Sequence, residues 1–416
     1  MRPLLIAGYA AAPKRRSGMR VASLSSFCSV VTLMGAACPM IWRWFYFGRA
    51  GGRSQAPSIY PTAPKGIPMS DIRVDQAELL RFFTAVFAAK GMSGPDAATV
   101  ADMLVWANLR GVDSHGAMRL PSYLDQIRKG EFDPKARPIL RPLLPATFIL
   151  ECARAAGPVC MLQAAAHAIE LADKFGVGVG LVSDTTHTGA IGRYAQWVAE
   201  RGYAALVMTA GPLFMAYHGA RTTSLATSPI AIGIPGPGGE PLVLDMATSV
   251  TAAGRIRQAA AEGKPISEGL AIDAEGKPTT DAAKAVTLLP LGGPKGSGLS
   301  LLFECLTGVM AGMPIITTLA GLTGPKLALQ NAMVIVFNIA NFRPLADYRR
   351  DVGLLIEVVK NLPRRDGFDE LLLPGERGGR EAELRRRNGI PIAAKLWREL
   401  GEIAQALGVP PPQSLR

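Results

Sequence analysis

The segment GVDSHGAMRLPSY, residues 111–123, gathers side chains suited to acid–base chemistry on a small anion. His115, one of four histidines in the chain, precedes Arg119 by four residues, so the two share a face if the chain turns helical here. A guanidinium binds a carboxylate through two parallel hydrogen bonds, and a nearby imidazole can exchange a proton with an adjacent oxygen. The pair suits a 2-oxo or 2-hydroxy acid. The alternative is that His115 caps the preceding helix and Arg119 is solvated.

A second histidine lies in SDTTHTGAIGRYA, residues 183–195. His187 follows a predicted strand and precedes a helix start rich in small residues, and helix N-termini at strand ends attract anions. A loop histidine without a chemical role explains the pattern equally well. His167 lies on an apolar helix face, which indicates a structural role, and His218 lies in an ordinary loop.

Three further segments could hold a phosphorylated ligand. In VLDMATS, residues 243–249, Asp245 could accept from ribose hydroxyls, although the sequence favours capping of the following helix. In LLPLGGPKGSGLSLLFECL, residues 288–306, four glycines around Lys295 precede a helical run, which suits phosphate or pyrophosphate or forms a plain turn. In LLLPGERGG, residues 371–379, Glu376 begins a helix.

Several sequence motifs that are typical of common enzyme classes are absent. The sequence contains no G-x-G-x-x-G turn, no Walker A motif, no G-x-S-x-G elbow and no paired-histidine metal motif. A Rossmann dehydrogenase, a P-loop ATPase and an α/β hydrolase are therefore not indicated. Dinucleotide binding by another backbone geometry remains open.

The elements that must position these residues follow from periodicity and turn signals. Helices are predicted over 72–90, 95–110 and 117–129, the first capped by Ser70 or Asp71. From about residue 146 strands alternate with helices, which predicts an α/β domain over 146–375. Two helices over 376–408, split by NGIP, are expected to pack with the N-terminal helices, so that 70–145 and 376–410 form one helical domain.

The distribution of charge and of cysteine indicates the kind of partner and the compartment to expect. The net charge is +12, but nine Lys or Arg and no acid lie in residues 1–70, which leaves +3 for the rest. A nearly neutral body argues against a nucleic-acid partner, and the run Arg377–Arg387, interleaved with glutamates, is predicted to be a solvated helix face. Five scattered cysteines without a CxxC favour a reducing compartment, hence the cytoplasm.

Residues 1–68 differ in composition from the rest of the chain and are considered separately from the folded body. The stretch from Val21 to Trp42 is mostly apolar and lies between basic residues, but its serines and Pro39 make it a poor membrane helix. A non-native or disordered segment is favoured over a targeting segment and over a membrane anchor. We expect the folded body to begin near Ser70.

In order, these segments resemble the type-2 malate/L-lactate dehydrogenase family. The resemblance rests on ANLRGVDSHGAMRLPSY, THTGAIGRYA, VLDMATS, EGKPTTD, LPLGGPKGSGLSL, LPGE and RRNGI, and it spans residues 70–410. It implies a non-Rossmann dinucleotide-binding domain with a largely antiparallel sheet, NAD or NADP as cofactor, a small 2-hydroxy or 2-oxo acid as substrate, no metal, and a homodimer.

The resemblance also implies residue roles. His115 is the expected proton donor in the reducing direction, with Ser114 beside it and Arg119 on the substrate carboxylate, while His187 competes for the proton-transfer role. The residues expected to contact the cofactor are Val243, Leu244, Asp245, Met246, Ala247, Pro294, Lys295, Gly375, Glu376 and Arg377.

Three alternatives remain open, and the first of them rests on a departure from the family pattern. The family usually has GTNP where this chain has ATSP, residues 226–229. A catalytically degenerate relative that only binds a dinucleotide is one alternative, and a ureidoglycolate- or imino-acid-specific member is another. A membrane-tethered binding protein using residues 21–42 is the third.

Overall fold

The computed structural model describes residues 72–321 and 330–415, so residues 1–68 lie outside the described part of the chain. Its helices are α1 Gln76–Ala89, α2 Gly94–Leu109, α3 Leu120–Arg128, α4 Gly157–Phe175, α5 Gly192–Glu200, α6 Ala253–Ala261, α7 Pro294–Glu304, α8 Leu345–Lys360, α9 Glu376–Asn388 and α10 Ala394–Leu407. Its strands are β1 Ile72–Val74, β2 Ile139–Leu144, β3 Thr147–Glu151, β4 Val177–Thr185, β5 Ala204–Ala210, β6 Leu213–Ala216, β7 Thr223–Ala226, β8 Ile230–Ile234, β9 Leu242–Met246, β10 Ala271–Ile272, β11 Pro278–Thr279, β12 Thr287–Leu288, β13 Gln330–Phe337 and β14 Ile390–Ile392.

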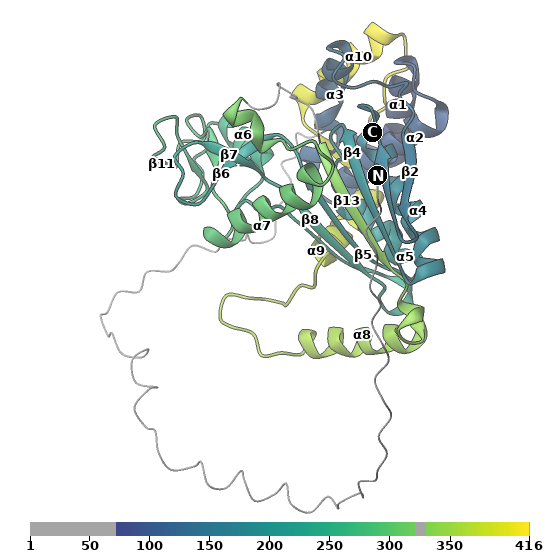
Figure 1. Ribbon diagram of the computed structural model, residues 1–416. Helices are drawn as coiled ribbons and strands as arrows, with labels where there is room; N and C mark the ends of the chain where they lie inside the picture. Colours follow the sequence, from purple (N-terminus) through teal and green to yellow (C-terminus); the bar gives the residue numbers. More distant parts are fainter. Residues whose placement is uncertain (1–71, 322–329, 416) are drawn as a thin grey trace, which may run out of the picture. The chain divides into compact units, whose positions relative to one another are not determined.

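A seven-stranded sheet forms the centre of the described chain, in the order β2-β3-β4-β13-β5-β8-β9 (Figure 1). The β3–β4 pair is parallel, and the other neighbouring pairs are antiparallel. The predicted α/β class is confirmed. Strand β13 inserts between β4 and β5 from far along the chain, so the sheet does not follow the sequence order of its strands.

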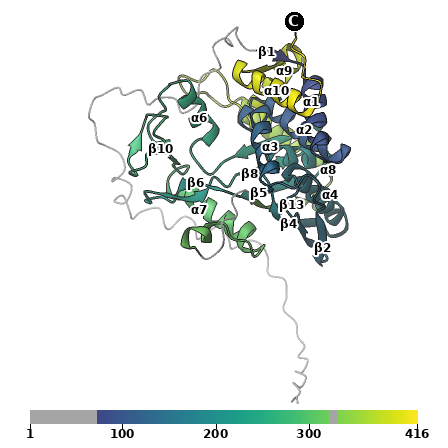
Figure 2. The ribbon, with the colours of Figure 1, turned by 90° about the horizontal axis from the view of Figure 1, so that it is seen from above.

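Apolar residues alternate between the two faces of this sheet, as strand geometry requires. Val182, Val207 and Val334 pack beneath α4 and α5. Leu181, Met208 and Met333 pack with Phe303 of α7 on the opposite face. Figure 2 shows α4 and α7 on opposite sides of β4, β5 and β13. Helices on both faces of the sheet therefore hold the ends of β4, β5 and β13 in place.

A second sheet, in the order β11-β10-β12-β6-β7, has its own small core of Met215, Leu225, Ile256 and Leu288. Ile256 lies on α6, so this core holds α6 in place. The start of α6 in turn borders the segment around His115, because a Cβ at Gly254 would lie 2.5 Å from the Cβ of Ser114.

The N-terminal and C-terminal segments share a third core, which includes Phe82, Phe83 and Leu104 together with Ile390 and Leu400. The first predicted helix starts later than expected, at Gln76. Residues 72–74 instead form β1, which pairs antiparallel with β14 at the predicted break between the two C-terminal helices. Asp75 caps α1, its Oδ1 accepting from the N–H of Ala77 at 2.7 Å.

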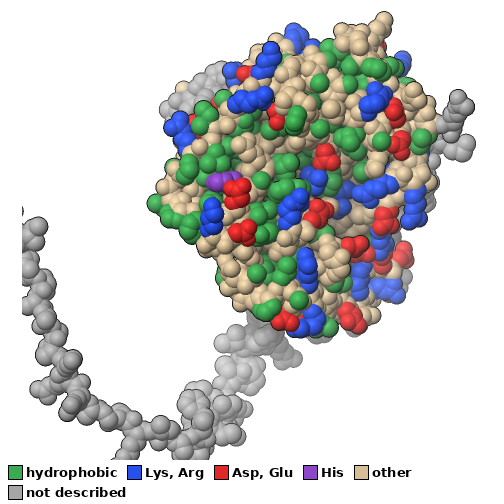
Figure 3. Space-filling model, turned by 90° about the vertical axis from the view of Figure 1, so that its right-hand side faces the viewer, with side chains coloured by type: hydrophobic (Ala, Val, Ile, Leu, Met, Phe, Trp, Pro, Cys, Tyr) green, Lys and Arg blue, Asp and Glu red, His purple; other side chains and the backbone are tan. Residues whose placement is uncertain are grey.

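The distribution of surface charge indicates which partners the protein can bind. On the face drawn in Figure 3, Lys and Arg side chains intermingle with Asp and Glu side chains. The run Arg377–Arg387 was predicted to be a solvated helix face, and Arg377, Arg380, Arg386 and Arg387 are indeed exposed. Arg385 departs from the prediction, because it is buried and pairs with Asp113 and Glu381. Within residues 72–321 and 330–415, none of the helices has the length and hydropathy needed to cross a bilayer.

Candidate functional site

The segment after α2 does not continue as an α-helix. It forms two 3-10 turns, Asp113–His115 and Ala117–Arg119, and becomes α-helical only at Leu120. Between the turns Gly116 has φ −95° and ψ −139°, which breaks any helical repeat. His115 and Arg119 therefore do not share a helical face. Arg119 instead folds back, and its Nε donates to the carbonyl of Ser114 at 2.9 Å.

Asn108, near the end of α2, fixes the shape of this segment. Its Nδ2 donates to Asp113 Oδ1 at 2.6 Å, and its Oδ1 accepts from the N–H of Ala117 at 2.7 Å. A Cβ at Gly116 would lie 2.2 Å from the Asn108 Oδ1, so the segment closes on the amide only because this position is glycine. From α9, Arg385 donates to the Asn108 carbonyl at 2.6 Å and to Asp113 at 2.7 Å.

The two candidate histidines meet. The rings of His115 and His187 stack with 5.4 Å between centroids and an interplanar angle of 29°. The Oγ of Ser114 lies 3.0 Å from Nδ1 of His115, and the phenol oxygen of Tyr123 lies 2.7 Å from Nδ1 of His187. Both Nδ1 atoms are thus engaged, and within the described chain neither Nε2 has a hydrogen-bond partner. The paired rings can present Nε2 to a ligand.

The surroundings keep both imidazoles neutral. Burial, with Arg119 and Arg257 adding to it, lowers the pKa of His115 to about 3. Burial, Arg119 and His115 lower the pKa of His187 well below its ordinary value. Burial raises the pKa of Tyr123 to about 12, so the phenol keeps its proton at neutral pH. Burial also lowers the pKa of Arg119, and no carboxylate in the described chain pairs with its guanidinium.

The loop that carries His187 is held by its neighbours. Gln330 Oε1 accepts from the N–H of Thr188 at 2.9 Å, and the hydroxyl of Tyr194 donates to the Thr188 carbonyl at 2.6 Å. No role for Gln330, Tyr194 or Tyr123 follows from the sequence pattern alone. For Tyr123 a signal existed, since it follows Arg119 by four residues at the start of α3, but nothing in the sequence linked it to His187.

The other two histidines lie apart from this pair. His167 is on the surface of α4, where its Nδ1 lies 2.9 Å from Glu170, which agrees with a structural role. His218 is exposed and borders Gly293 in the glycine-rich loop.

Strand β9 brings the predicted cofactor segments together. The N–H of Val243 donates to the Pro374 carbonyl at 3.3 Å, which places the segment of Gly375 beside it. Two residues beyond the strand, the Thr248 carbonyl accepts from Leu291 at 2.8 Å, which brings the loop of Pro294 and Lys295 to the other end of β9. Arg110 Nη2 donates to the Gly375 carbonyl at 2.8 Å and ties this region to the end of α2.

Asp245 does not cap the following helix. Its Oδ2 accepts from the N–H of Gly192, the first residue of α5, at 2.9 Å. Asp245 keeps solvent access, but the protein around it displaces enough water to raise the pKa of its carboxyl to about 6. Because one oxygen is engaged by Gly192, the other remains for a ligand hydroxyl.

The other residues predicted to contact the cofactor differ in how exposed their side chains are. Val243 is buried, and Leu244, Met246 and Ala247 are half-buried along or just after β9. Pro294, Lys295 and Arg377 are exposed. The carboxylate of Glu376 is already used within the chain, since it accepts from the N–H of Leu373 at 2.9 Å and pairs with Lys360 and Arg380.

These groups fit a dinucleotide. Asp245 offers an acceptor for ribose hydroxyls, and Lys295 offers an ammonium at the start of α7, where backbone N–H groups favour an anion. At Gly375 the backbone has φ +86°, and a Cβ there would lie 2.9 Å from the Val243 carbonyl. The close approach of these two segments therefore requires glycine.

The segment ATSP, where the chain departs from the family pattern, is packed between α7 and the residues after β9. The Oγ of Ser300 donates to the Ala226 carbonyl at 2.8 Å and lies 3.0 Å from the Ser228 hydroxyl. The Oγ1 of Thr248 donates to the Thr227 carbonyl at 2.9 Å. The departure is accommodated by hydrogen bonds and leaves the contact between α7 and Thr248 intact.

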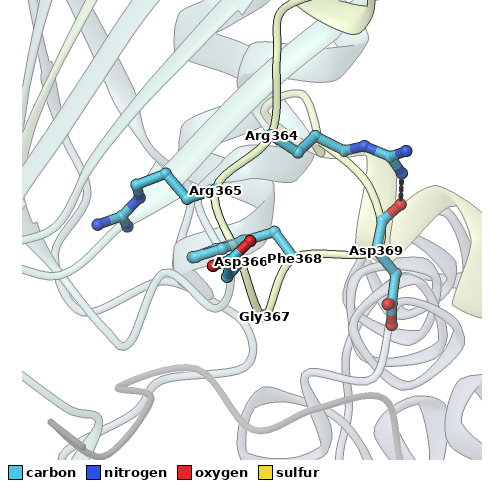
Figure 4. Close-up of a pocket in the computed structure, with 6 residues that line it drawn as sticks. All are labelled: Arg364, Arg365, Asp366, Gly367, Phe368 and Asp369. Carbon is cyan, nitrogen blue, oxygen red and sulfur yellow. Dashed lines mark hydrogen bonds between the residues drawn. The ribbon is translucent and has the colours of Figure 1, made fainter. Parts of the chain in front are cut away.

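A shallow hollow lies elsewhere, in the loop between α8 and α9 (Figure 4). Arg364 donates there to the Asp369 carbonyl, and the Arg365 guanidinium lies 5.1 Å from the centre of the Phe368 ring. The residues that line it are Arg364, Arg365, Asp366, Gly367, Phe368 and Asp369. None of the predicted site residues is among them.

Known proteins match this chain over most of its length. The family model for malate/L-lactate dehydrogenase matches residues 74–401. A malate dehydrogenase of Pyrococcus abyssi is 34% identical over 81% of this chain and 96% of its own length. The NAD(+)-dependent ureidoglycolate dehydrogenase of Escherichia coli K12 is 31% identical over 74% of this chain and 89% of its own. The sulfolactate dehydrogenase structure from Methanocaldococcus jannaschii superposes with a TM-score of 0.74 at 31% identity, covering 81% of this chain and 98% of that one.

Proposed function

Because the chain belongs to the malate/L-lactate dehydrogenase family and is a dehydrogenase of hydroxy-acid CH–OH groups, we propose that it transfers a hydride between a nicotinamide and C2 of a small 2-hydroxy or 2-oxo acid. The observation that carries the proposal is the His115–His187 stack, with two free Nε2 atoms beside the unpaired guanidinium of Arg119. These are an acid–base group and a carboxylate-binding group in one place.

The chain's own residues do the positioning and the proton transfer. Arg119 is held by Ser114 through Nε, which leaves its terminal nitrogens for the substrate carboxylate. Orientation of this kind contributes several kcal/mol to lowering a barrier in well-aligned systems. A bound nicotinamide would supply or accept the hydride. His115 would give the proton to the forming alkoxide in reduction and take it from the hydroxyl in oxidation, with Ser114 holding its Nδ1.

The proton-transfer role depends on the substrate's charge. In the free protein the cation of Arg119 helps keep His115 neutral, as a base for oxidation requires. A carboxylate bound to Arg119 offsets that cation and raises the pKa of His115, which favours the protonated form needed for reduction. His187, whose Nδ1 is engaged by Tyr123, would support the neighbouring ring or share its role.

The cofactor, NAD or NADP, would lie along β9 without a Rossmann loop. Asp245 would accept from ribose hydroxyls, and Lys295 with the start of α7 would bind the pyrophosphate. At Gly375 to Arg377 the backbone and the exposed guanidinium are available, whereas the Glu376 carboxylate is engaged within the chain. The N-terminal residues 70–145 and the C-terminal residues 376–410 would form the substrate-side domain, and 146–375 the cofactor domain.

We also propose a homodimer that works in a reducing compartment such as the cytoplasm. Helix α8 buries Val352 but exposes an apolar stripe that includes Leu355 at 66% and Val358 at 61%. An apolar helix face of this kind is costly in water and is covered at low cost by the same face of a second copy. The five scattered cysteines without a CxxC favour such a compartment.

The direct test is a screen of the full chain with NADH and with NADPH against a panel of 2-oxo acids, together with the cyclic imine Δ1-piperideine-2-carboxylate. Consumption of reduced cofactor with a 2-oxo acid supports the proposal. Tight cofactor binding without turnover of any panel member would contradict it and favour a non-catalytic dinucleotide-binding protein.

A further inference from the structure

The peptide that joins Thr186 to His187 lies against the first residue of α4. A Cβ placed on Gly157 would lie 2.6 Å from the carbonyl oxygen of Thr186 and 2.5 Å from that of His187. Because both distances are shorter than van der Waals contact, only glycine at this position lets the peptide approach the helix so closely. The backbone of His187 is therefore seated on the N-terminus of α4.

The side chain of Thr186 caps this helix. The residue before the helix, Ala156, has no polar side chain that could do so. Instead, the Oγ1 of Thr186 accepts from the N–H of Gly157 at 2.9 Å and donates to the Ala155 carbonyl at 3.1 Å. Thr186 is only 3% exposed, so water has no access to replace either bond. A hydroxyl from the loop after β4 thus performs the capping role that Ser or Thr usually performs from the residue before a helix.

Strained backbone accompanies this contact. In the described part of the chain three non-glycine residues have positive φ, and all three lie here: Ala153 at 48° and Arg154 at 63° after β3, and Asp184 at 53° in β4. Such angles are unfavourable for L residues and persist only where the surrounding structure fixes them. The N–H of Arg154 donates to the Asp184 carbonyl at 2.7 Å, which holds the two strained segments together. The turn thereby brings the Ala155 carbonyl to Thr186.

His187 is fixed on its C-terminal side as well. The N–H of Thr188 donates to Gln330, and the Thr188 carbonyl accepts from Tyr194. With both neighbours of His187 held, a displacement of the peptide on α4 moves the imidazole, which stacks on His115. In well-aligned active sites a misplacement of about 1 Å can lower the rate by about 100-fold.

We propose that Thr186 is a positioning residue for the reaction: its hydroxyl fixes the peptide of His187 to the start of α4 and so sets the stack of His187 on His115. This inference rests on the proposed function, in which the two Nε2 atoms face the substrate. Thr186 acts through His187 and does not touch the substrate. Loss of its hydroxyl therefore lowers kcat and leaves the binding of cofactor and substrate nearly unchanged.

The test separates the hydroxyl of Thr186 from the stability of α4 in general. Thr186→Val keeps the shape of the side chain and removes both hydrogen bonds, and Thr186→Ser restores the hydroxyl. Thr185→Val is the neighbouring control, because the Thr185 hydroxyl donates to the same Ala155 carbonyl, at 3.4 Å, while the cap on α4 comes from Thr186. Tyr203→Phe removes a hydrogen bond to Asp173, about 24 Å along α4 from its first residue.

Wild type and each variant, all as the full chain, are assayed for reduction of the best 2-oxo acid, for binding of reduced cofactor by fluorescence, and for thermal unfolding. We expect Thr186→Val to lower kcat by at least about 10-fold, while the KM for the acid and the cofactor affinity stay within about 3-fold of wild type. Thr186→Ser should recover kcat to within about 3-fold of wild type, since Ser caps helices as well as Thr does. Thr185→Val and Tyr203→Phe should lower the unfolding temperature by at most about 2–4 °C and keep kcat within about 2-fold of wild type.

The outcomes distinguish this role from general damage. If Thr186→Val does not fold, Thr186→Ala, which removes the same hydroxyl with a smaller side chain, takes its place. A variant without the hydroxyl that keeps the wild-type kcat overturns the role of Thr186, whatever its unfolding temperature. A serine variant as slow as the valine variant also overturns it, and so does a fall in cofactor affinity as large as the fall in kcat. Failure of wild type to reduce any 2-oxo acid overturns the proposed function, and this inference with it.

Discussion

The imidazole of His115 stacks on that of His187, with 5.4 Å between the ring centroids. One ring comes from the turn after α2 and the other from the loop after β4. Each has its Nδ1 engaged by a hydroxyl, from Ser114 and Tyr123, so the two rings form a unit with its proton-transfer atoms directed away from those partners. The half-buried unit is neutral in the free protein, and this sets its pH behaviour.

The pH dependence of reduction should reflect this lowered basicity. Because kcat/KM reports the free protein and the pKa of His115 lies near 3, the fraction that carries the proton falls about 10-fold for each pH unit above neutrality. We expect kcat/KM for 2-oxo acid reduction to fall continuously from pH 7 to 9, and kcat/KM for oxidation of the 2-hydroxy acid to change little. A plateau in the reducing direction between pH 7 and 9 would mean that another group donates the proton.

Replacing Tyr123 with Phe should slow turnover without weakening cofactor binding. The change leaves Nδ1 of the half-buried His187 without its partner, which disturbs the tautomer and orientation of the ring. We expect kcat to fall by about 10-fold, in steady-state assays with saturating cofactor. Tyr203→Phe is the matched control, since its hydroxyl donates to Asp173 at 2.6 Å outside the site. Equal activity in the two variants would remove Tyr123 from the account.

Gly116→Ala should damage both stability and activity. The backbone angles at Gly116 lie outside the left-handed region, so the cost arises from the new Cβ, which would lie 2.2 Å from Asn108 Oδ1. We expect the free energy of unfolding to fall by about 1–3 kcal/mol, because the side chains around the new Cβ must move to make room for it. Displacement of Asn108 also releases the N–H of Ala117 and shifts His115, so kcat falls.

The control for this variant is Gly379→Ala on α9, where a Cβ would meet nothing within 4 Å. It should stabilise the helix by about 0.5–1 kcal/mol. Denaturant unfolding of both variants measures the two effects. A Gly116→Ala protein as stable and active as wild type would show that the Asn108 contact does not fix the segment.

Leu355→Glu should weaken the proposed dimer. Leu355 is 66% exposed on α8, so a charge there costs nothing in the monomer but must be desolvated in an interface. We expect wild type to elute as a dimer in size-exclusion chromatography with light scattering, and Leu355→Glu to shift toward the monomer at micromolar concentration. Leu143→Glu, at a site 62% exposed on β2, is the control and should leave the mass unchanged. A monomeric wild type would refute this interface.

Much of the fold could be predicted because its signals are local. The long helices α1, α2 and α4 and the strands β4, β5 and β13 have clear periodicity and turn residues at their ends. The short strand β1 could not be predicted, because three residues carry no period and their partner, β14, lies at the other end of the chain. Helix α8 also escaped prediction, since its apolar face is exposed and gives no core pattern.

The residues of the candidate site could be selected from the sequence, but their geometry could not. His115, Arg119 and His187 were singled out by type, yet the proposed helical spacing does not exist, because Gly116 breaks the segment into two turns. Tyr123 was assigned no role, since its contact with His187 depends on tertiary packing that spacing along the chain cannot reveal. Arg385 was placed on a solvated face for the same reason.

The central claim is that His115 exchanges the proton with the substrate oxygen. It is tested most directly by His115→Ala, assayed for reduction of the best 2-oxo acid and, separately, for binding of reduced cofactor by fluorescence. We predict that kcat falls by about 10²–10⁴-fold while cofactor affinity stays within about 2-fold of wild type, and that His167→Gln changes neither. A His115→Ala protein that turns over at the wild-type rate would contradict the account.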